Sequence, residues 1–257
     1  MEQSILFYDS GIGGLSTLSS TIKLLPCERY IYFADNKNVP YGNRTKQEIS
    51  NLVFENISRL LTRFKIKLIV IACNTATSLA IDDLRAKINI PIIGIEPALK
   101  VAERKSKNKE ILMISTKATA RSERYFKLAK SVSCKVHTCY MPKLASKIEH
   151  GLISHNLDIS KEINFLKETL ETFKNIDQIV LGCTHYSLVS DKLSKELSLS
   201  VTDGNFGVAK NIYRTLKKNS TIRNSGFLNL MIILSKSSTE LTTQYRQILE
   251  KFALKQL

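Results

Sequence analysis

Two cysteines occupy the same kind of position in separate parts of the sequence. Cys73 ends the apolar run 68–72, Cys183 ends the run 179–182, and small polar residues follow each of them. A continuous apolar run is typical of a buried parallel strand, and ligands bind at the carboxyl ends of such strands. The polar pair Asn74-Thr75 is predicted as the turn and N-cap of the next helix. The sequence therefore predicts two thiols, each at a strand end that faces a ligand.

Two thiols on opposite sides of one carbon are suited to racemisation. One thiolate removes the proton from Cα and the other thiol delivers a proton to the far face, whereas a single base would tend to return the proton to its original side. Cysteine can serve in both states because its unperturbed pKa, about 8.5, lies close to neutrality. Asp9 and His185 are predicted to tune the thiols or relay protons. Donors predicted for a substrate carboxylate are Ser10, Asn74, Thr75, Thr184 and the backbone N–H groups of the helix starts.

A different chemistry for the same residues is nucleophilic catalysis by Cys183 with His185 as its base. The remaining cysteines, Cys27, Cys134 and Cys139, are interpreted as small buried hydrophobic residues. The spacing of Cys134 and Cys139 around His137 matches no common zinc pattern, so no metal site is predicted.

The elements that must position these residues alternate between strand and helix. Strands are predicted at 5–8, 30–34, 68–72, 90–95, 110–114, 135–140, 179–182, 199–202 and 228–234. The helices between them include 15–24, 46–65, 118–130, 160–173, 206–217 and 238–253. This alternation predicts an α/β protein with mainly parallel sheets. Because Asp9-Ser10 and Ser115-Thr116 occupy comparable places before the two cysteines, we expect two similar α/β domains with the active site in the cleft between them.

Two glycine-containing turns lie close to the predicted strand ends. Gly11 and Gly13 fit the first two glycines of a dinucleotide fingerprint, but Ser16 holds the third place, so no dinucleotide site is predicted. The turn is still expected to bring backbone N–H groups close to a small anion. The tripeptide Pro40-Tyr41-Gly42 is predicted to be a tight turn that presents an aromatic side chain.

Composition limits the class of protein. The 257 residues carry 43% hydrophobic and 24% charged residues, which is ordinary for a globular chain. No run approaches the ~18 apolar residues of a membrane span, no signal peptide is apparent, and five cysteines argue for reduced thiols, so a cytoplasmic protein is expected. The net charge of +15 leaves open a basic nucleic-acid-binding protein, although no nucleic-acid-binding motif accompanies the charge.

Five motifs then identify a resemblance. In order they are Asp9-Ser10-Gly11-Ile12-Gly13-Gly14, Pro40-Tyr41-Gly42, Ala72-Cys73-Asn74-Thr75-Ala76, Glu96-Pro97 and Leu181-Gly182-Cys183-Thr184-His185. This ordered set resembles the bacterial glutamate racemases, cofactor-independent enzymes of the aspartate/glutamate racemase superfamily. The family usually has proline where Ser187 stands, and the stretch 203–205 also departs from its pattern.

The resemblance implies a role for each matching residue. Cys73 would take the proton from D-glutamate and Cys183 from L-glutamate, with Asp9, His185 and Glu149 assisting. The residues implied to hold the substrate are Ser10, Pro40, Tyr41, Gly42, Asn74, Thr75, Thr116, Thr119 and Thr184. No cofactor is implied, and the product D-glutamate would supply peptidoglycan synthesis.

The resemblance also implies that the chain crosses twice between its domains. Residues 1–96 with 208–257 would form the first domain, and residues 97–207 the second. An aspartate racemase of the same superfamily stays open as an alternative, and so does a homodimer.

Overall fold

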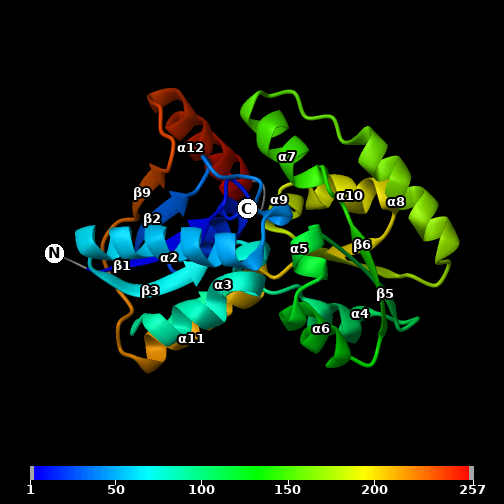
Figure 1. Ribbon diagram of the computed structural model, residues 1–257, viewed down its shortest axis with the longest axis horizontal. Coiled ribbons are helices and arrows are strands. Elements are labelled where there is room, and N and C mark those ends of the chain that lie inside the picture. Colours follow the sequence, from blue (N-terminus) through cyan, green and yellow to red (C-terminus); the bar gives the residue numbers. More distant parts are fainter. Residues whose placement is uncertain (1–2, 255–257) are drawn as a thin grey trace.

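The computed structural model of the chain describes residues 3–254 and contains two parallel β-sheets (Figure 1). The first sheet runs in the order β4 (Ile92–Gly94), β3 (Ile66–Ile71), β1 (Ser4–Asp9), β2 (Arg29–Ala34) and β9 (Asn229–Leu234). The second runs in the order β6 (Lys135–Tyr140), β5 (Glu110–Ser115), β7 (Gln178–Gly182) and β8 (Ser200–Thr202). The predicted fold class, α/β with two parallel sheets, is confirmed.

Helices lie on both faces of each sheet, as parallel strands require. Those around the first sheet are α1 (Leu15–Leu24), α2 (Lys46–Arg63), α3 (Asn74–Lys87), α11 (Asn205–Lys218) and α12 (Thr239–Leu254). Those around the second sheet are α4 (Leu99–Lys105), α6 (Glu123–Lys130), α7 (Leu144–Ile153), α8 (Ser160–Thr172) and α10 (Ser190–Leu197). Three short helical turns, η1 (Tyr41–Asn43), α5 (Lys117–Ala120) and α9 (Thr184–Ser187), follow strands β2, β5 and β7.

The two sheets repeat one strand order. Read from one edge, the first sheet begins β4-β3-β1-β2, and the second, read in the matching direction, is β8-β7-β5-β6. Strand β3, which Cys73 follows, thus corresponds to β7, which Cys183 follows. Both cysteines stand one step from the first strand of their half, so the repeated local sequence has a counterpart in the repeated topology.

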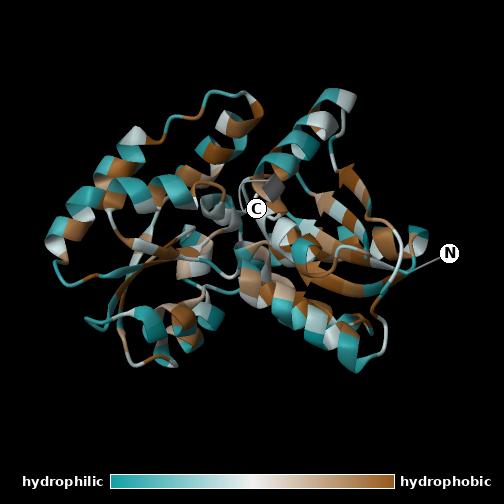
Figure 2. Ribbon diagram, turned by 180° about the vertical axis from the view of Figure 1, so that it is seen from behind, coloured by the Kyte–Doolittle hydropathy of each residue, from teal (hydrophilic) through white to brown (hydrophobic). Residues whose placement is uncertain are grey.

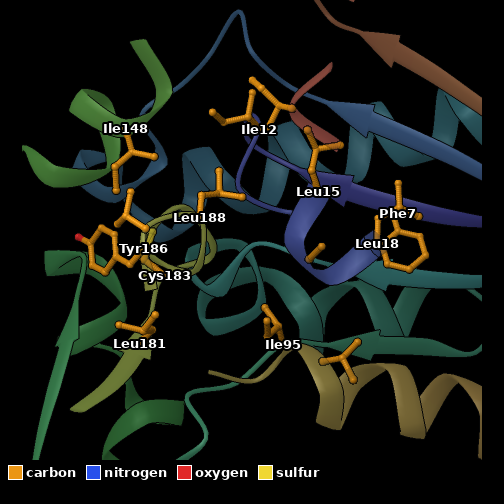
Figure 3. Packing of buried hydrophobic residues seen from close by; sticks show 14 of the residues in the cluster. Phe7, Ile12, Leu15, Leu18, Ile95, Ile148, Leu181, Cys183, Tyr186 and Leu188 are labelled. Atoms are coloured by element: carbon orange, nitrogen blue, oxygen red, sulfur yellow. The ribbon is translucent and has the colours of Figure 1, made fainter. Parts of the chain in front are cut away.

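Alternating residues of each strand pack into different cores because successive side chains point to opposite faces of a sheet. Phe7 belongs to a core shared with α1 and α11, whereas Tyr8 belongs to the core under α2 and α3. The first of these cores also contains Ile148 and Leu181 of the second half (Figure 3). Figure 2 shows apolar residues concentrated in the strands and hydrophilic residues on the outer faces of the helices. The first of these cores therefore extends across both halves.

The chain passes between the sheets at two places that touch. A Cβ on Gly204, which precedes α11, would come within 2.6 Å of the backbone oxygen of Glu96, so the outgoing and returning segments lie side by side. After the return, the Thr17 hydroxyl donates to Asn205 Oδ1 at 2.7 Å, and β9 pairs with β2. The predicted domain division stays a proposal. Its second boundary, between residues 207 and 208, falls inside α11, and its residues 1–2 and 255–257 lie outside the described residues.

Three local expectations are corrected. The helix predicted at 118–130 is two helices, because the Ser122 hydroxyl accepts from the Tyr125 N–H and starts a new helix at Glu123. The N-cap of α3 is Cys73, and Asn74 is already helical. The aromatic ring of Tyr41 is buried, with 2% of its surface exposed, because its hydroxyl bonds inward to Asp35 and Tyr8. None of the helices in residues 3–254 is long and apolar enough to cross a membrane.

Candidate active site

A pocket between the two sheets collects most of the residues that the sequence singled out. Cys73 and Cys183 both line it, as does His185. The predicted substrate-binding residues that line it are Ser10, Pro40, Tyr41, Gly42, Asn74, Thr75, Thr116 and Thr184. The cavity that these residues enclose is narrow, with a volume of about 30 Å³. Asp9, Glu149 and Thr119 are not among the lining residues and lie behind it.

The Cys73 side of the pocket is built from the ends of β1 and β3. Hydrogen bonding pairs these strands, so Ser10 and Cys73 leave the sheet side by side, and the Ser10 hydroxyl lies 3.8 Å from the Cys73 sulfur. Burial, reinforced by the nearby Asp9 carboxylate, raises the pKa of the Cys73 thiol to about 12. Cys73 is therefore a protonated thiol at neutral pH.

The Cys183 side carries a buried chain of polar groups. The Cys183 sulfur lies 3.9 Å from Nδ1 of His185, and Nε2 of the same ring lies 2.6 Å from Oε2 of Glu149. Burial lowers the pKa of His185, but the contacts with Cys183 and Glu149 outweigh burial and hold it well above its usual value of 6.5. Burial raises the pKa of Glu149, and the bonds from His185, the Ile12 N–H and Tyr245 reverse this effect and lower it. The pair is therefore an imidazolium and a carboxylate, and it places a positive charge beside the Cys183 sulfur.

The positive charge of His185 decides whether this residue can act as the base for a Cys183 nucleophile. The imidazole does reach the cysteine two residues before it, so distance alone permits a Cys183–His185 nucleophile and base. An imidazolium has no free lone pair and cannot accept the proton of the thiol. The arrangement instead places a fixed cation 3.9 Å from the Cys183 sulfur.

The glycine-rich turn packs against this chain of polar groups. The Ile12 N–H donates to Glu149 Oε2 at 2.9 Å, and the Gly11 N–H donates to Asp9 Oδ1 at 2.8 Å. The anions that these two N–H groups bind are thus carboxylates of the protein, which corrects the expectation of an external anion there. A Cβ on Gly13 would come within 2.5 Å of the Thr184 hydroxyl. Glycine is required at position 13 because α9 approaches the turn so closely there.

Asp9 joins the two halves of the molecule. Its Oδ1 closes a local turn with Gly11, as expected of an aspartate at a strand end, and its Oδ2 accepts from the Thr184 hydroxyl at 3.1 Å. Burial raises the pKa of Asp9 from 3.8 to about 7, although the nearby His185 cation lowers it. A carboxyl group that titrates near neutrality thus lies behind both thiols.

Hydroxyl and amide groups line the rest of the pocket. The Thr75 hydroxyl lies 3.0 Å from that of Thr116, and Thr119 lies behind both, 3.1 Å from Thr116. This contact connects α3 of the first half to α5 of the second. The Asn74 side chain is 3% exposed, and its Nδ2 has no hydrogen-bond partner among the described residues. Because an unpaired buried donor is costly, the Asn74 amide is available to an acceptor in the pocket.

Several lining residues were not singled out from the sequence. They are Val39, Asn43, Lys117, Pro142 and Ala145. Lys117 could have been found, because it directly follows Thr116 and supplies a cation at the pocket. Within residues 3–254 no three His, Cys, Asp or Glu side chains gather in a group that could hold a metal ion.

Comparison with known proteins agrees with this arrangement. The family model of the Asp/Glu/Hydantoin racemases matches residues 19–209. A glutamate racemase of Clostridium botulinum (strain Alaska E43 / Type E3) is 40% identical, over 93% of this chain and 98% of its own.

Two solved structures share the fold over nearly the whole chain. Escherichia coli glutamate racemase with L-glutamate and an activator superposes with a TM-score of 0.83 and 25% identity, covering 98% of this chain and 96% of that one. Francisella tularensis glutamate racemase with D-glutamate superposes with a TM-score of 0.81 and 26% identity, covering 97% and 94%.

The chain is an enzyme of the isomerase class, as its motifs predicted. More particularly, it belongs to the Asp/Glu/Hydantoin racemase family.

Proposed function

We propose that the chain interconverts L-glutamate and D-glutamate by a two-base mechanism in which Cys73 and Cys183 act on opposite faces of Cα. The observation that carries the proposal is the pairing of the two cysteines. They follow corresponding strands of two similarly ordered sheets, and they line one pocket from its two sides.

The charges around the two cysteines determine which of them starts the reaction as the base. The imidazolium of His185 stands beside the Cys183 sulfur, where it can offset a negative charge, and burial keeps Cys73 a thiol. The Cys183 thiolate takes the Cα proton of L-glutamate, and the Cys73 thiol delivers its own proton to the opposite face. This step leaves a Cys183 thiol, a Cys73 thiolate and D-glutamate, and D-glutamate reacts by the reverse route.

The acidity of the substrate is the main obstacle, because the Cα–H of an amino acid is far less acidic than a thiol. A positioned base contributes only about 10²–10⁴-fold, so fixed donors must meet the negative charge that develops on the substrate carboxylate. The unpaired amide of Asn74 and the first turn of α3 are suitable donors, with Thr75, Thr116 and Thr184 beside them.

Glutamate is proposed as the substrate because the relatives described above are named glutamate racemases and two of them were solved with L- or D-glutamate bound. The product would supply D-glutamate for peptidoglycan synthesis. A cytoplasmic setting is proposed because both thiols must stay reduced, and all five cysteines, which lie within the described residues, carry free thiols. A homodimer stays a prediction, to be checked by light scattering.

Proton NMR in D₂O is the direct test. The purified protein receives L-glutamate or D-glutamate with a reducing agent and no cofactor. Loss of the Cα proton signal from both enantiomers, with decay of optical activity, is the expected result. Exchange with aspartate in place of glutamate would move the substrate to the aspartate alternative and keep the mechanism.

If the folded protein exchanges neither amino acid, the proposed function is wrong. The alternative from composition, nucleic-acid binding, would then be tested by titrating duplex DNA and RNA across a salt series, because a steep loss of affinity with salt marks phosphate contacts.

A further inference from the structure

The C-terminal helix α12 reaches across from the first half of the molecule to the second. Its neighbouring residues Gln244 and Tyr245 both contact α7: Gln244 Nε2 donates to the Ile153 carbonyl at 3.2 Å, and the Tyr245 hydroxyl donates to Glu149 Oε1 at 3.1 Å. Figure 1 shows α12 beside α7 above the junction of the two halves. The tail of the chain is thus in contact with the carboxylate that holds His185.

The Tyr245 side chain has the environment of a fixed donor. It is fully buried, and its ring lies 6.4 Å from that of Tyr32, whose own hydroxyl donates to the Gly11 carbonyl at 2.7 Å. Burial, reinforced by the Glu149 carboxylate, holds the pKa of Tyr245 well above 10, so the phenol keeps its proton.

Glu149 depends on this bond for its geometry. Its Oε2 is taken by His185 and by the Ile12 N–H, whereas among the described residues the hydrogen bond recorded for Oε1 comes from Tyr245. Without the Tyr245 hydroxyl, Oε1 would be a buried acceptor with no donor, and the carboxylate would be free to rotate or to take up a proton. Either change loosens the His185 imidazolium beside Cys183.

We propose that Tyr245 is a positioning residue for the Cys183 half of the reaction, acting through Glu149 and His185. This inference rests on the proposed function. It gives the tail helix a part in catalysis although Tyr245 does not line the pocket. It also predicts an effect on one thiol and not on the other.

The test is Tyr245→Phe, which removes the hydroxyl and keeps the ring. We expect kcat/KM to fall roughly tenfold, the size expected for a lost hydrogen bond to a charged group. Because L- and D-glutamate are equally stable, kcat/KM must fall equally in both directions. The overall rates therefore cannot show which thiol is affected, but isotope effects can.

Deuterium at Cα reports which proton transfer limits the reaction. With deuterated L-glutamate, Cys183 breaks the labelled bond, so slower transfer at Cys183 raises the isotope effect on kcat/KM. With deuterated D-glutamate, Cys73 breaks the labelled bond, and a slow Cys183 lets the carbanion return, which lowers the isotope effect. The expected result for Tyr245→Phe is a rise with L-glutamate and a fall with D-glutamate.

Two control variants isolate the hydroxyl. Tyr30→Phe also removes a buried hydroxyl bond, 2.6 Å to the Leu25 carbonyl, and should leave both isotope effects at their wild-type values. Gln244→Ala weakens the docking of α12 on α7 without touching Glu149, so it should not reproduce the pattern. If Tyr245→Phe keeps wild-type isotope effects, or if Gln244→Ala gives the same pattern, the inference is wrong.

Folding and function are checked separately. Thermal unfolding of each variant establishes that the assay temperature lies below its transition. If Tyr245→Phe does not fold, site-specific 3-fluorotyrosine keeps the shape and changes the strength of the donor, and unaltered isotope effects in that protein would overturn the inference. Absence of Cα exchange in the wild-type protein would refute the proposed function itself, which is a distinguishable outcome.

Discussion

Asp9 and Thr184 form a hydrogen bond across the junction of the two halves, with 3.1 Å between Asp9 Oδ2 and the Thr184 hydroxyl. Asp9 ends β1 of the first sheet, and Thr184 begins α9 after β7 of the second. Each is the immediate neighbour of a residue that lines the pocket. The bond therefore fixes the two strand ends relative to one another, and the protonation of Asp9 is coupled to that contact.

The substitution Asp9→Asn is expected to stabilise the fold more at neutral pH than in acid. Burial raises the pKa of Asp9 from 3.8 to about 7, so between these values the folded chain holds this proton more tightly than the unfolded chain does. The contribution of Asp9 to the stability of the fold is thus fully present in acid and decreases as the pH rises from about 4 to about 7. Above pH 7 it no longer changes. Asparagine cannot ionise, so it removes the free-energy cost of a buried carboxylate at neutral pH, which is at most about 4 kcal/mol. Urea unfolding of both proteins from pH 4.5 to 8 measures the difference, and a gap that shrinks with rising pH would contradict the assignment.

Cys73→Ser and Cys183→Ser should each abolish racemisation and leave the melting temperature almost unchanged. A serine hydroxyl is too weak an acid to become the base, and the loss of a positioned base is expected to cost at least about 10²–10⁴-fold. Cys27→Ser, at a half-buried thiol outside the pocket, is the matched control and should keep its activity. Near wild-type turnover by either pocket variant would rule out the two-base mechanism.

Asn74→Asp should weaken glutamate binding much more than it alters stability. The change replaces an unpaired buried donor by an acceptor that repels the substrate carboxylate. We expect KM to rise about 10–100-fold, from the loss of one charged hydrogen bond and the added repulsion. Asn74→Ala removes the donor without the repulsion and should give a smaller rise. Equal KM values for the two variants would show that Asn74 does not face the carboxylate.

Gly13→Ala should destabilise the protein and lower kcat together. The new Cβ would lie 2.5 Å from the Thr184 hydroxyl and 2.7 Å from the backbone nitrogen of His185, so α9 must move. Overpacking of this kind costs about 1–3 kcal/mol. Gly207→Ala is the control, because no atom lies within 4 Å of its added Cβ in α11, and alanine there should be neutral or slightly stabilising. Denaturation and steady-state kinetics on both variants check the prediction.

The parts of the fold that the sequence predicted are those governed by local pattern. The apolar runs before Cys73 and Cys183 gave strand position and burial, and the repeated context around them anticipated two matching sheets. The pocket follows from the same pattern, because residues just after parallel strands meet at one edge. The thiols and the hydroxyls of Thr75, Thr116 and Thr184 accordingly line one pocket, and their roles there stay predictions.

The features that were missed depend on contacts between distant segments. No local pattern states that Tyr245 meets Glu149 or that Gly13 leaves room for α9, since these pairs are far apart in the chain. The glycine-rich turn was expected to hold an external anion because its glycines are the visible signal, whereas the carboxylates that occupy it come from Asp9 and from the distant Glu149. Likewise, Tyr41 turns inward because of Asp35 and Tyr8, which the turn motif does not contain.

The repeated strand order has a consequence for how the two thiols can diverge. A twofold axis lying in the plane of a flat carbanion exchanges its two faces, so two similarly ordered halves facing each other across such an axis would offer the geometry of a symmetric dimer. In a symmetric dimer the two halves must have the same sequence, whereas the two halves of a single chain can differ. One thiol can therefore have a serine beside it and the other an imidazolium, and each face of the substrate can meet a group tuned on its own.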